Sequence, residues 1–293
     1  MDGVIVVDKS AGWTSHDVVA RFRRFARTKK VGHLGTLDPI ATGVLPLVVG
    51  RATRLARFYV HGDKVYEAVV RFGWATTTYD KAGEPVSAIQ SVQLDAAALE
   101  PLLDCFRGEF LQVPPPVSAK KVRGKRAYEL ARKNIAVRLD PVKVQVSQLT
   151  LEEVEGDRVR LRVHCSGGTY LRSIAHELGQ ALGCGAHLEQ LRRTAASEFG
   201  IAQARTMEQL ESLAVEERLF DALMPAAGLL PGMPEIYVDE PAVVRIRSGR
   251  NFPASPFRGP AAARYVKAVT YEGELVAIGE AVLPNLYHPV VVL

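Results

Sequence analysis

The sequence predicts an α+β protein in two domains, and three observations support this prediction. Alternating strand-like runs and helical apolar stripes are interspersed over the first two thirds of the chain. Two prolines and a glycine then cluster within "LLPGMPEIYVDEP", which is typical of a domain boundary. Short strand-like runs fill the remainder. We therefore expect domains at residues 1–231 and 232–293, the second a small β-rich module.

The N-terminal part is expected to form a strand, then a helix, then two further strands. The β-branched run Gly3–Val7 predicts the first strand, and a helix capped by Ser15 follows, apolar on one face and arginine-rich on the other. The segment "GVLPLVVG" predicts a buried strand in which Pro46 causes a local irregularity. Lys64–Phe72 alternates as a strand with one apolar face.

Further elements are expected on both sides of a proline run. Asp95 is a candidate cap for a helix with an apolar stripe that includes Leu99 and Leu103. The run "VPPP" excludes helix and central strand, and a basic hairpin-like segment and a short helix are expected after it. Arg158–Cys165 alternates strictly, and a helix from about Leu171 to Leu182 follows a "SGGTY" turn. Beyond the boundary, "RYVKAVTY", "ELVAIGEAV" and "PVVVL" predict strands.

Positive charge is clustered in this chain. Of 293 residues, 47% are hydrophobic, which predicts a packed core, and the net charge is +5. Arg21–Lys30 holds six basic residues and no acid, and Lys120–Lys133 holds seven basic residues and one acid. Such clusters indicate a polyanionic partner, nucleic acid or an acidic membrane, although either cluster alone could be a solvated face.

Several protein classes are disfavoured. The three cysteines are widely spaced, which suggests neither a disulfide framework nor a zinc site, and no apolar run is long enough to span a bilayer. The first ten residues do not resemble a signal peptide. We expect a reduced, cytoplasmic setting and no metal.

Asp38 is the leading candidate for chemistry. It is the only acid between Val18 and Gly62, a stretch that also contains nine arginines and lysines. It could simply cap a turn, because Asp-Pro favours turns. Nearby arginines would instead lower its pKa and leave an ionised carboxylate that can act as nucleophile or base. Glycines on both sides of it would let the backbone approach a substrate, but they lack phosphate-loop spacing.

Other candidate residues are weaker alone. His33 and Asp38 lack a serine or cysteine nucleophile, and "HELGQ" at His176 lacks the second histidine of a zinc motif. Tyr170 and Arg172 would share a face in extended chain, where an aromatic ring and a guanidinium suit a nucleic-acid enzyme. Tyr170 and Tyr66 could equally be core residues.

Four motifs in order resemble the TruB family of bacterial tRNA pseudouridine synthases: "GHLGTLDPIATGVLP", "DKVYEAVVRFG", "CSGGTYLRSIAHELG" and "CGAHLEQLRRTAASEF". The resemblance covers roughly residues 3–230 and implies a pseudouridine synthase fold with a mixed, mostly antiparallel central sheet flanked by helices. The tail is similar to a small PUA-like RNA-binding domain. Ser10, Thr77 and Gly167 depart from the family pattern, although Asp80 is retained.

The resemblance also implies residue roles. Asp38 matches the catalytic aspartate, Tyr66 an active-site tyrosine, and Arg172 the arginine that pairs with the aspartate. Matches to substrate-binding positions are His33, Tyr170, Leu191 and Lys9. The segment with Arg123, Lys125 and Arg126 matches the part that clasps the RNA stem-loop.

The expected reaction is isomerisation of uridine in the TΨC arm of tRNA, through a flipped base and a covalent intermediate on Asp38. Attack at uracil C6 and at ribose C1′ both remain open. We expect no cofactor, no guide RNA, no membrane and a monomer. The alternatives are a synthase of the same fold acting on another RNA, a guide-dependent synthase, and a non-catalytic RNA-binding or RNA-folding protein.

Overall fold

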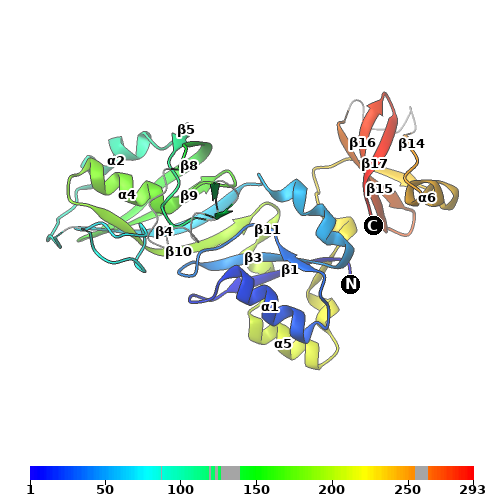
Figure 1. The fold of residues 1–293 in the computed structure, drawn as a ribbon, viewed down its shortest axis with the longest axis horizontal. Coiled ribbons are helices and arrows are strands. Elements are labelled where there is room, and N and C mark those ends of the chain that lie inside the picture. The colour runs from blue at the N-terminus through cyan, green and yellow to red at the C-terminus, as the bar shows by residue number, and fades with distance from the viewer. Residues whose placement is uncertain (87, 119, 123–124, 127–138, 255–262) are drawn as a thin grey trace.

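Two β-sheets organise the chain. The computed structural model describes residues 1–293 except 87, 119, 123–124, 127–138 and 255–262. In Figure 1 the larger sheet runs along the molecule, with α2 and α4 at one end, α1 and α5 beneath the other, and a β-rich module set to one side. The α+β class and the separate β-rich C-terminal part are therefore confirmed.

The larger sheet has ten strands, in the order β12-β1-β3-β10-β4-β9-β8-β5, with β2 paired to β3 and β11 to β10. β10 pairs with β3 in parallel and with β4 antiparallel, so the sheet is mixed but mostly antiparallel, as expected. Its strands are β1 Gly3–Lys9, β2 Val31–His33, β3 Thr42–Val49, β4 Lys64–Phe72, β5 Gly108–Gln112, β8 Val142–Glu155, β9 Arg158–Cys165, β10 Ala186–Ala196, β11 Phe199–Gly200 and β12 Leu223–Pro225.

The helices in this part lie close to their expected positions. They are α1 Ser15–Phe25, α2 Ala96–Asp104, α4 Leu171–Ala181 and α5 Met207–Val215, with 3-10 turns at Gly50–Tyr59, Ile201–Gln203, Leu219–Ala222 and Ala226–Gly228. Asp95 caps α2 as predicted. The predicted cap of α1 is wrong by one residue, because Thr14 and Asp17 form a reciprocal capping box there. Ser15 is instead buried, and its hydroxyl bonds both backbone groups of Leu37.

β1 is buried on both faces, which explains its continuous apolar sequence. Ile5 and Val7 pack into the main core beneath the helices, whereas Val4 and Val6 pack into a second core on the opposite face. A strand covered on only one face would alternate apolar and polar residues. The second core also contains residues of the C-terminal module.

Pro46 does not disturb its strand, contrary to our expectation. The β1–β3 register runs without a shift through the Val6–Pro46 pair. The Pro46 carbonyl accepts from Leu34 N at 3.0 Å, so this residue presents its polar edge away from β1. On that side β10 pairs with β3 only as far as Gly43, and β2 pairs with β3 only from Leu47 onward, so no N–H is needed at position 46.

The predicted strands Lys64–Phe72 and Arg158–Cys165 are confirmed with those bounds. β8 and β10 were not predicted. In the basic segment, β6 Lys121–Val122 pairs with β7 Lys125–Arg126, which fits the expected hairpin. The short helix expected after this hairpin lies outside the described residues.

The C-terminal module has a five-stranded sheet, in the order β13-β15-β16-β17-β14. Its elements are β13 Glu235–Val238, α6 Glu240–Arg247, β14 Phe252–Pro253, β15 Tyr265–Thr270, β16 Leu275–Leu283 and β17 Leu286–Val292. The module has a small hydrophobic core of its own, to which α6 contributes Val243 and Ile246. The expected boundary at residue 231 falls between the two sheets, and we keep 1–231 and 232–293 as the proposed domains.

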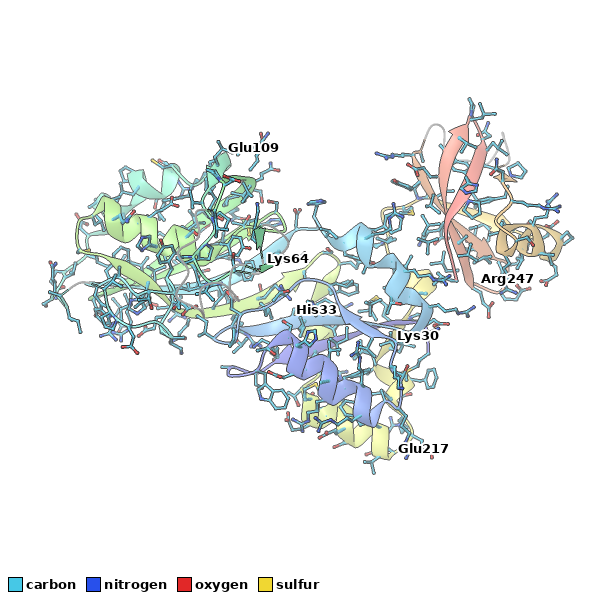
Figure 2. All side chains as sticks on the ribbon, in the orientation of Figure 1. Lys30, His33, Lys64, Glu109, Glu217 and Arg247 are labelled. Carbon is cyan, nitrogen blue, oxygen red and sulfur yellow. The ribbon has the colours of Figure 1, made fainter. Side chains whose placement is uncertain are left out.

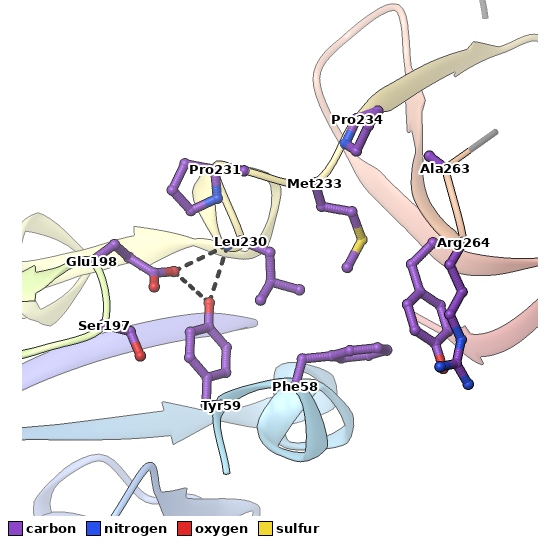
Figure 3. Close-up of a pocket in the computed structure, with 12 residues that line it drawn as sticks. Phe58, Tyr59, Ser197, Glu198, Leu230, Pro231, Met233, Pro234, Ala263 and Arg264 are labelled. Carbon is purple, nitrogen blue, oxygen red and sulfur yellow. Dashed lines mark hydrogen bonds between the residues drawn. The ribbon is translucent and has the colours of Figure 1, made fainter. Parts of the chain in front are cut away.

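A polar clasp of Tyr59, Glu198 and Leu230 holds the end of the first part, and Lys267 and an apolar core join that part to the module (Figure 3). The hydroxyl of Tyr59 donates to Glu198 Oε1 at 2.5 Å, and the backbone N–H of Leu230 donates to the same oxygen at 3.0 Å. Lys267, buried in the module, donates to the carbonyls of Ala227 and Leu229. An open cavity of about 600 Å³ lies beside the clasp, between Phe58, Met233 and Arg264.

Tyr59→Phe tests the contribution of the clasp. Removal of this buried hydroxyl leaves Glu198 with fewer donors and should lower the free energy of unfolding by about 1–3 kcal/mol. Urea denaturation followed by circular dichroism measures the change. Tyr237→Phe is the matched control, because that hydroxyl bonds Glu235 at the exposed surface and water can replace the bond. Equal stability of both variants and the parent would show that the clasp contributes nothing.

Candidate active site

A cleft of about 230 Å³ collects five of the residues singled out in the sequence. Its lining comes from the loop before β3, from the turn before β4, from β4 and β10, and from the loop that enters α4. The residues are Gly35, Thr36, Leu37, Asp38, Val60, Lys64, Tyr66, Gly167, Gly168, Thr169, Tyr170, Leu171, Arg172, Leu191 and Arg193. His33 and Lys9 do not line this cleft.

The loop that carries Asp38 is fixed from three sides. The Asp38 carbonyl accepts from Ala41 N at 3.0 Å, and the Pro39 carbonyl accepts from Gly12 N at 2.8 Å. Ser15 holds Leu37 through the two bonds described above. The turn is therefore closed by backbone bonds, which leaves the Asp38 side chain, 33% exposed, for the cleft rather than for turn capping.

Arg172 is the cation that contacts Asp38. Only 4% of Arg172 is exposed, and its Nε lies 2.9 Å from Asp38 Oδ2. The Nε–H has no aligned acceptor, so the contact acts mainly through charge. The prediction that Tyr170 and Arg172 share a face of an extended segment is wrong. Tyr170 is the N-cap of α4, and Arg172 lies in the first turn of that helix. Both nevertheless reach the cleft.

Asp80 is a second acid at this site, and unlike Asp38 it is buried; no role for it was predicted from the sequence. Its Oδ2 lies 3.5 Å from Arg172 Nη1, which also donates to the Thr78 carbonyl at 3.2 Å. Its other oxygen accepts from Thr78 Oγ1 at 2.6 Å and from Ala82 N at 3.0 Å. Arg172 therefore bridges two carboxylates that are far apart in sequence.

The prediction that the pKa of Asp38 is lowered is wrong. Burial raises this pKa, Asp80 raises it further, and the opposing effects of Arg172 and Lys9 do not reverse the direction. The arginines near Asp38 in sequence do not gather round it in space. Arg21 pairs with Glu211 on α5 at 2.6 Å, and Arg23 donates to the Val31 carbonyl.

Lys9 lies behind the Asp38 loop. It is fully buried, and its ammonium donates to the carbonyls of Ser10, Trp13 and, at 3.5 Å, Pro39. Burial lowers its pKa to about 8. With these partners Lys9 is placed to hold the loop, and the geometry does not present it to a ligand in the cleft.

His33 ends β2, beside the cleft rather than in it, and Figure 2 labels it together with Lys64 at the start of β4. Its Nδ1 is buried without a hydrogen-bond partner, and burial lowers the pKa of the imidazole. Tyr66 on β4 and Leu191 on β10 are both 8% exposed and line the cleft as expected. Burial raises the pKa of Tyr66, against the effect of Arg193.

Two buried cations at the cleft were missed by the sequence analysis. Arg193, 1% exposed, donates to the carbonyls of Val44, Thr36 and Gly35 and so anchors the start of the Asp38 loop. Lys64 is also buried, and burial lowers its pKa to about 8. Both lie on strands in which basic residues are common, so nothing in the sequence distinguished them from surface charges.

Two glycines permit close backbone contacts around the cleft. Gly43 has φ +97°, and a Cβ there would lie 2.2 Å from the Arg193 carbonyl oxygen. This glycine therefore permits the close contact between β3 and β10, rather than the approach of a substrate to the backbone. A Cβ at Gly167, a position that departs from the family pattern, would lie 2.5 Å from the Val60 carbonyl. Gly167 therefore lets the α4 entry loop pack on the Val60 turn.

Some expected contacts cannot be placed. Arg123 lies outside the described residues, and for Lys125 and Arg126 the backbone alone is described. Among the residues whose placement is described, no cluster of three or more His, Cys, Asp or Glu side chains could hold a metal ion. The described part of the chain also contains no helix with the length and hydropathy needed to cross a membrane.

Comparison with known proteins identifies close relatives. The model of the TruB family pseudouridylate synthase N-terminal domain matches residues 23–171, and that of the tRNA pseudouridylate synthase B C-terminal domain matches residues 172–230. A tRNA pseudouridine synthase B from Solibacter usitatus (strain Ellin6076) is 69% identical over all 293 residues, the full length of both chains. One from Stutzerimonas stutzeri (strain A1501) is 40% identical, over 96% of this chain and 92% of the relative.

Solved structures share the fold. A chain of a Cbf5-Nop10-Gar1 complex superposes with a TM-score of 0.72 at 28% identity, over 97% of this chain and 79% of that chain. A chain of an H/ACA RNP bound to a substrate RNA containing 2′-deoxyuridine gives a TM-score of 0.73 at 25% identity, over 98% and 83%. The expected pseudouridine synthase fold with a PUA-like C-terminal domain is thereby confirmed.

Arg193→Met tests the anchoring of the Asp38 loop. The change removes the donor from the buried Val44 carbonyl and from the carbonyls of Gly35 and Thr36, and it should lower the free energy of unfolding by about 2–3 kcal/mol. The neighbouring Arg192→Met is the matched control. Arg192 pairs with Asp8 at a half-exposed position, so its loss should cost about 1 kcal/mol or less. Urea denaturation of both variants measures the difference, and similar losses would contradict the anchoring role.

Proposed function

The chain belongs to the TruB family of pseudouridylate synthases, and we propose that it isomerises uridine to pseudouridine in the TΨC arm of tRNA, with Asp38 as the nucleophile. The observation that carries the assignment of Asp38 is its contact with the buried guanidinium of Arg172, at 2.9 Å, in a cleft of nucleobase size. We infer tRNA as the substrate class from the names of the relatives, and we infer the residue roles from the chemistry of the cleft.

The reaction breaks the N1–C1′ bond of uridine, turns the uracil and forms a C5–C1′ bond; C5 loses a proton and N1 gains one, so the product is an isomer of the substrate. An ionised Asp38 can attack C1′ and displace uracil, or add to C6 of the base. On either route the bond from the carboxylate is temporary, and its cleavage regenerates Asp38. The rearrangement is redox-neutral and consumes no water, so the proposal requires no cofactor.

Arg172 keeps the nucleophile in its reactive form. Burial and Asp80 both favour protonated Asp38, whereas Arg172 and Lys9 favour the carboxylate. A fixed guanidinium also aims one carboxylate oxygen, which raises the probability of attack in the productive orientation. Asp80 holds the guanidinium from the opposite side and is therefore a positioning residue in this scheme.

The target uridine must leave its stack to reach Asp38. Extrusion costs a few kcal/mol, and packing on an aromatic side chain returns about 1–3 kcal/mol per base. Tyr66 supplies this ring in our proposal, while Tyr170 and Leu191 line the pocket around the base. Because burial raises the pKa of Tyr66, the phenol is neutral at physiological pH, and we assign it packing rather than action as a phenolate base.

Exposed basic residues would contact the RNA phosphates. Within the Arg21–Lys30 cluster, Arg24, Arg27, Lys29 and Lys30 remain exposed after Arg21 and Arg23 have bound protein partners. We propose that a monomer acts on free tRNA in the cytoplasm without a guide RNA. His33 and the basic hairpin are proposed RNA contacts.

The proposed function is tested by incubation of the purified protein with an unmodified tRNA transcript and, separately, with its isolated T-arm stem-loop. No guide RNA is added, and pseudouridine is mapped by carbodiimide probing. Modification of one T-arm uridine in both RNAs is expected. Binding of both RNAs without modification would favour a non-catalytic RNA-binding protein, and modification of a different RNA alone would reject the tRNA assignment.

Asp38→Asn should abolish pseudouridine formation. The amide cannot form the temporary bond to the nucleoside, whereas RNA affinity should stay within about threefold, because phosphate contacts dominate it. A filter-binding assay and the mapping assay measure the two effects. Asp95→Asn, which retains a good helix cap remote from the cleft, is the control. Normal turnover by the Asp38 variant would exclude the nucleophile assignment.

Arg172→Ala should shift the acid limb of the rate–pH profile to higher pH. Activity requires ionised Asp38 and declines as pH falls through its pKa; without the guanidinium that lowers this pKa, the decline begins at higher pH. Turnover at neutral pH should fall by about 100-fold or more, with RNA affinity changed by less than about threefold. Arg172→Lys retains a cation and should shift the limb less. Equal losses of turnover and affinity would instead identify Arg172 as a phosphate contact.

A further inference from the structure

The loop of residues 76–84 carries Asp80 and is tied to β10 through its backbone. The N–H of Leu188 donates to the Tyr79 carbonyl at 3.0 Å, and the N–H of Lys81 donates to the Leu188 carbonyl at 3.0 Å. Thr76 and Thr78 bond Asp80 within the loop. These bonds fix the loop to the sheet, but they do not join it to α4, where Arg172 lies.

Arg172 and a ring stack both join this loop to α4. Arg172 provides the first contact, through the Thr78 carbonyl and the Asp80 carboxylate. The second is a face-to-face stack of Tyr79 on His176, with ring centroids 3.7 Å apart and planes inclined by 7°. Residues 172 and 176 are one turn apart on one face of the helix, so the loop meets α4 at adjacent points.

Tyr79 adopts a backbone conformation that is unusual for its residue type. Its φ is +63°, in the left-handed region that a bulky side chain rarely enters. Such conformations persist where surrounding contacts determine them, and they concentrate at functional sites. Here the conformation directs the Tyr79 ring onto α4 while the next residue, Asp80, faces Arg172.

His176 has no other described use for its ring. Its Nδ1 is buried without a hydrogen-bond partner, and burial lowers the pKa of the imidazole, so the ring is neutral at physiological pH. Because the neutral His176 ring stacks on Tyr79 and its Nδ1 makes no hydrogen bond, we infer that the ring serves packing rather than acid–base chemistry. The "HELGQ" motif suggests His176 only as a metal ligand, and the described residues contain no cluster that could hold a metal ion.

We propose that the Tyr79–His176 stack is a positioning device, which holds the Asp80 loop against α4 and thereby fixes the guanidinium of Arg172 beside Asp38. The proposal rests on the proposed function, because it concerns the nucleophile assigned there. Tyr79 and His176 act through Arg172 and do not touch the substrate. Without the stack, the loop remains bonded to β10 but can shift relative to α4, so that Asp80 and the Thr78 carbonyl hold Arg172 less firmly.

Three variants test the device in single-turnover reactions at saturating tRNA. His176→Ala removes the stack and should lower the rate by about tenfold, because small displacements of catalytic groups are costly. Its dissociation constant for tRNA should stay within about twofold of the parent, since no phosphate contact is lost. His176→Phe restores a stacking ring and should recover the rate to within about threefold. Gln180→Ala, on an exposed position of the same helix, is the matched control and should behave as the parent.

The rate–pH profile separates positioning from a general structural effect. A loosened Arg172 lowers the pKa of Asp38 less, so the acid limb of His176→Ala should move to higher pH, and that of His176→Phe should return. The titratable and charged groups around Asp38 are Arg172 from α4, Asp80 from the loop, Lys9 from β1, Lys64 and Tyr66 from β4, Arg193 from β10 and Tyr170 before α4. None of them is changed in these variants.

The outcomes distinguish this inference from the proposed function. If the parent protein forms no pseudouridine in tRNA, the proposed function fails, and the positioning role with it. If the parent is active and His176→Ala reacts at the same rate with an unmoved acid limb, the positioning role alone is overturned. A slower His176→Ala that His176→Phe does not rescue would also overturn it, since the stack would then not be the cause.

Discussion

The site depends on one buried guanidinium that is shared between two carboxylates. Arg172 is almost fully buried, and a cation in such a place requires nearby anions. Asp38 and Asp80 provide them from two loops that are distant in sequence. The same contact places Asp38 where the proposed mechanism needs a nucleophile, and it counteracts the burial that raises the pKa of Asp38. The stability of this cleft and the ionisation of Asp38 therefore both depend on the Arg172 side chain.

The sheet places these loops close together. The β3–β10 contact, made possible by Gly43, brings the strand after the Asp38 loop against the strand that carries Leu191 and Arg193. β4, on the other side of β10, contributes Tyr66 and Lys64. The mixed sheet is thus the scaffold on which the Asp38 loop, β10 and β4 meet, and the parallel pairing of β3 with β10 lies directly beside the site.

Much of this could be predicted from local pattern, and the failures have physical causes. Strict alternation defined β4 and β9 with the bounds observed, because each has one buried face. β10 was missed because two bulges, near Leu188 and Arg193, break its alternation. The Asp38–Arg172 pair followed from the family resemblance. The direction of the Asp38 pKa shift was not predicted, because basic residues close to Asp38 in sequence, such as Arg21, pair with acids elsewhere. The role of Asp80 was not predicted either, because Asp80 approaches Arg172 only in the tertiary structure.

The second core described above extends beyond the catalytic part. It joins Val4 and Val48 of the large sheet and Leu55 of the Gly50–Tyr59 segment to Ile278 and Leu293 of the C-terminal module. A chain cut after residue 231 would expose this apolar face of β1 and β3 to water, which favours aggregation. Shared burial of this kind also couples the unfolding of the two parts into a single cooperative transition. The C-terminal module is therefore a structural component of the catalytic part and not only an appended unit.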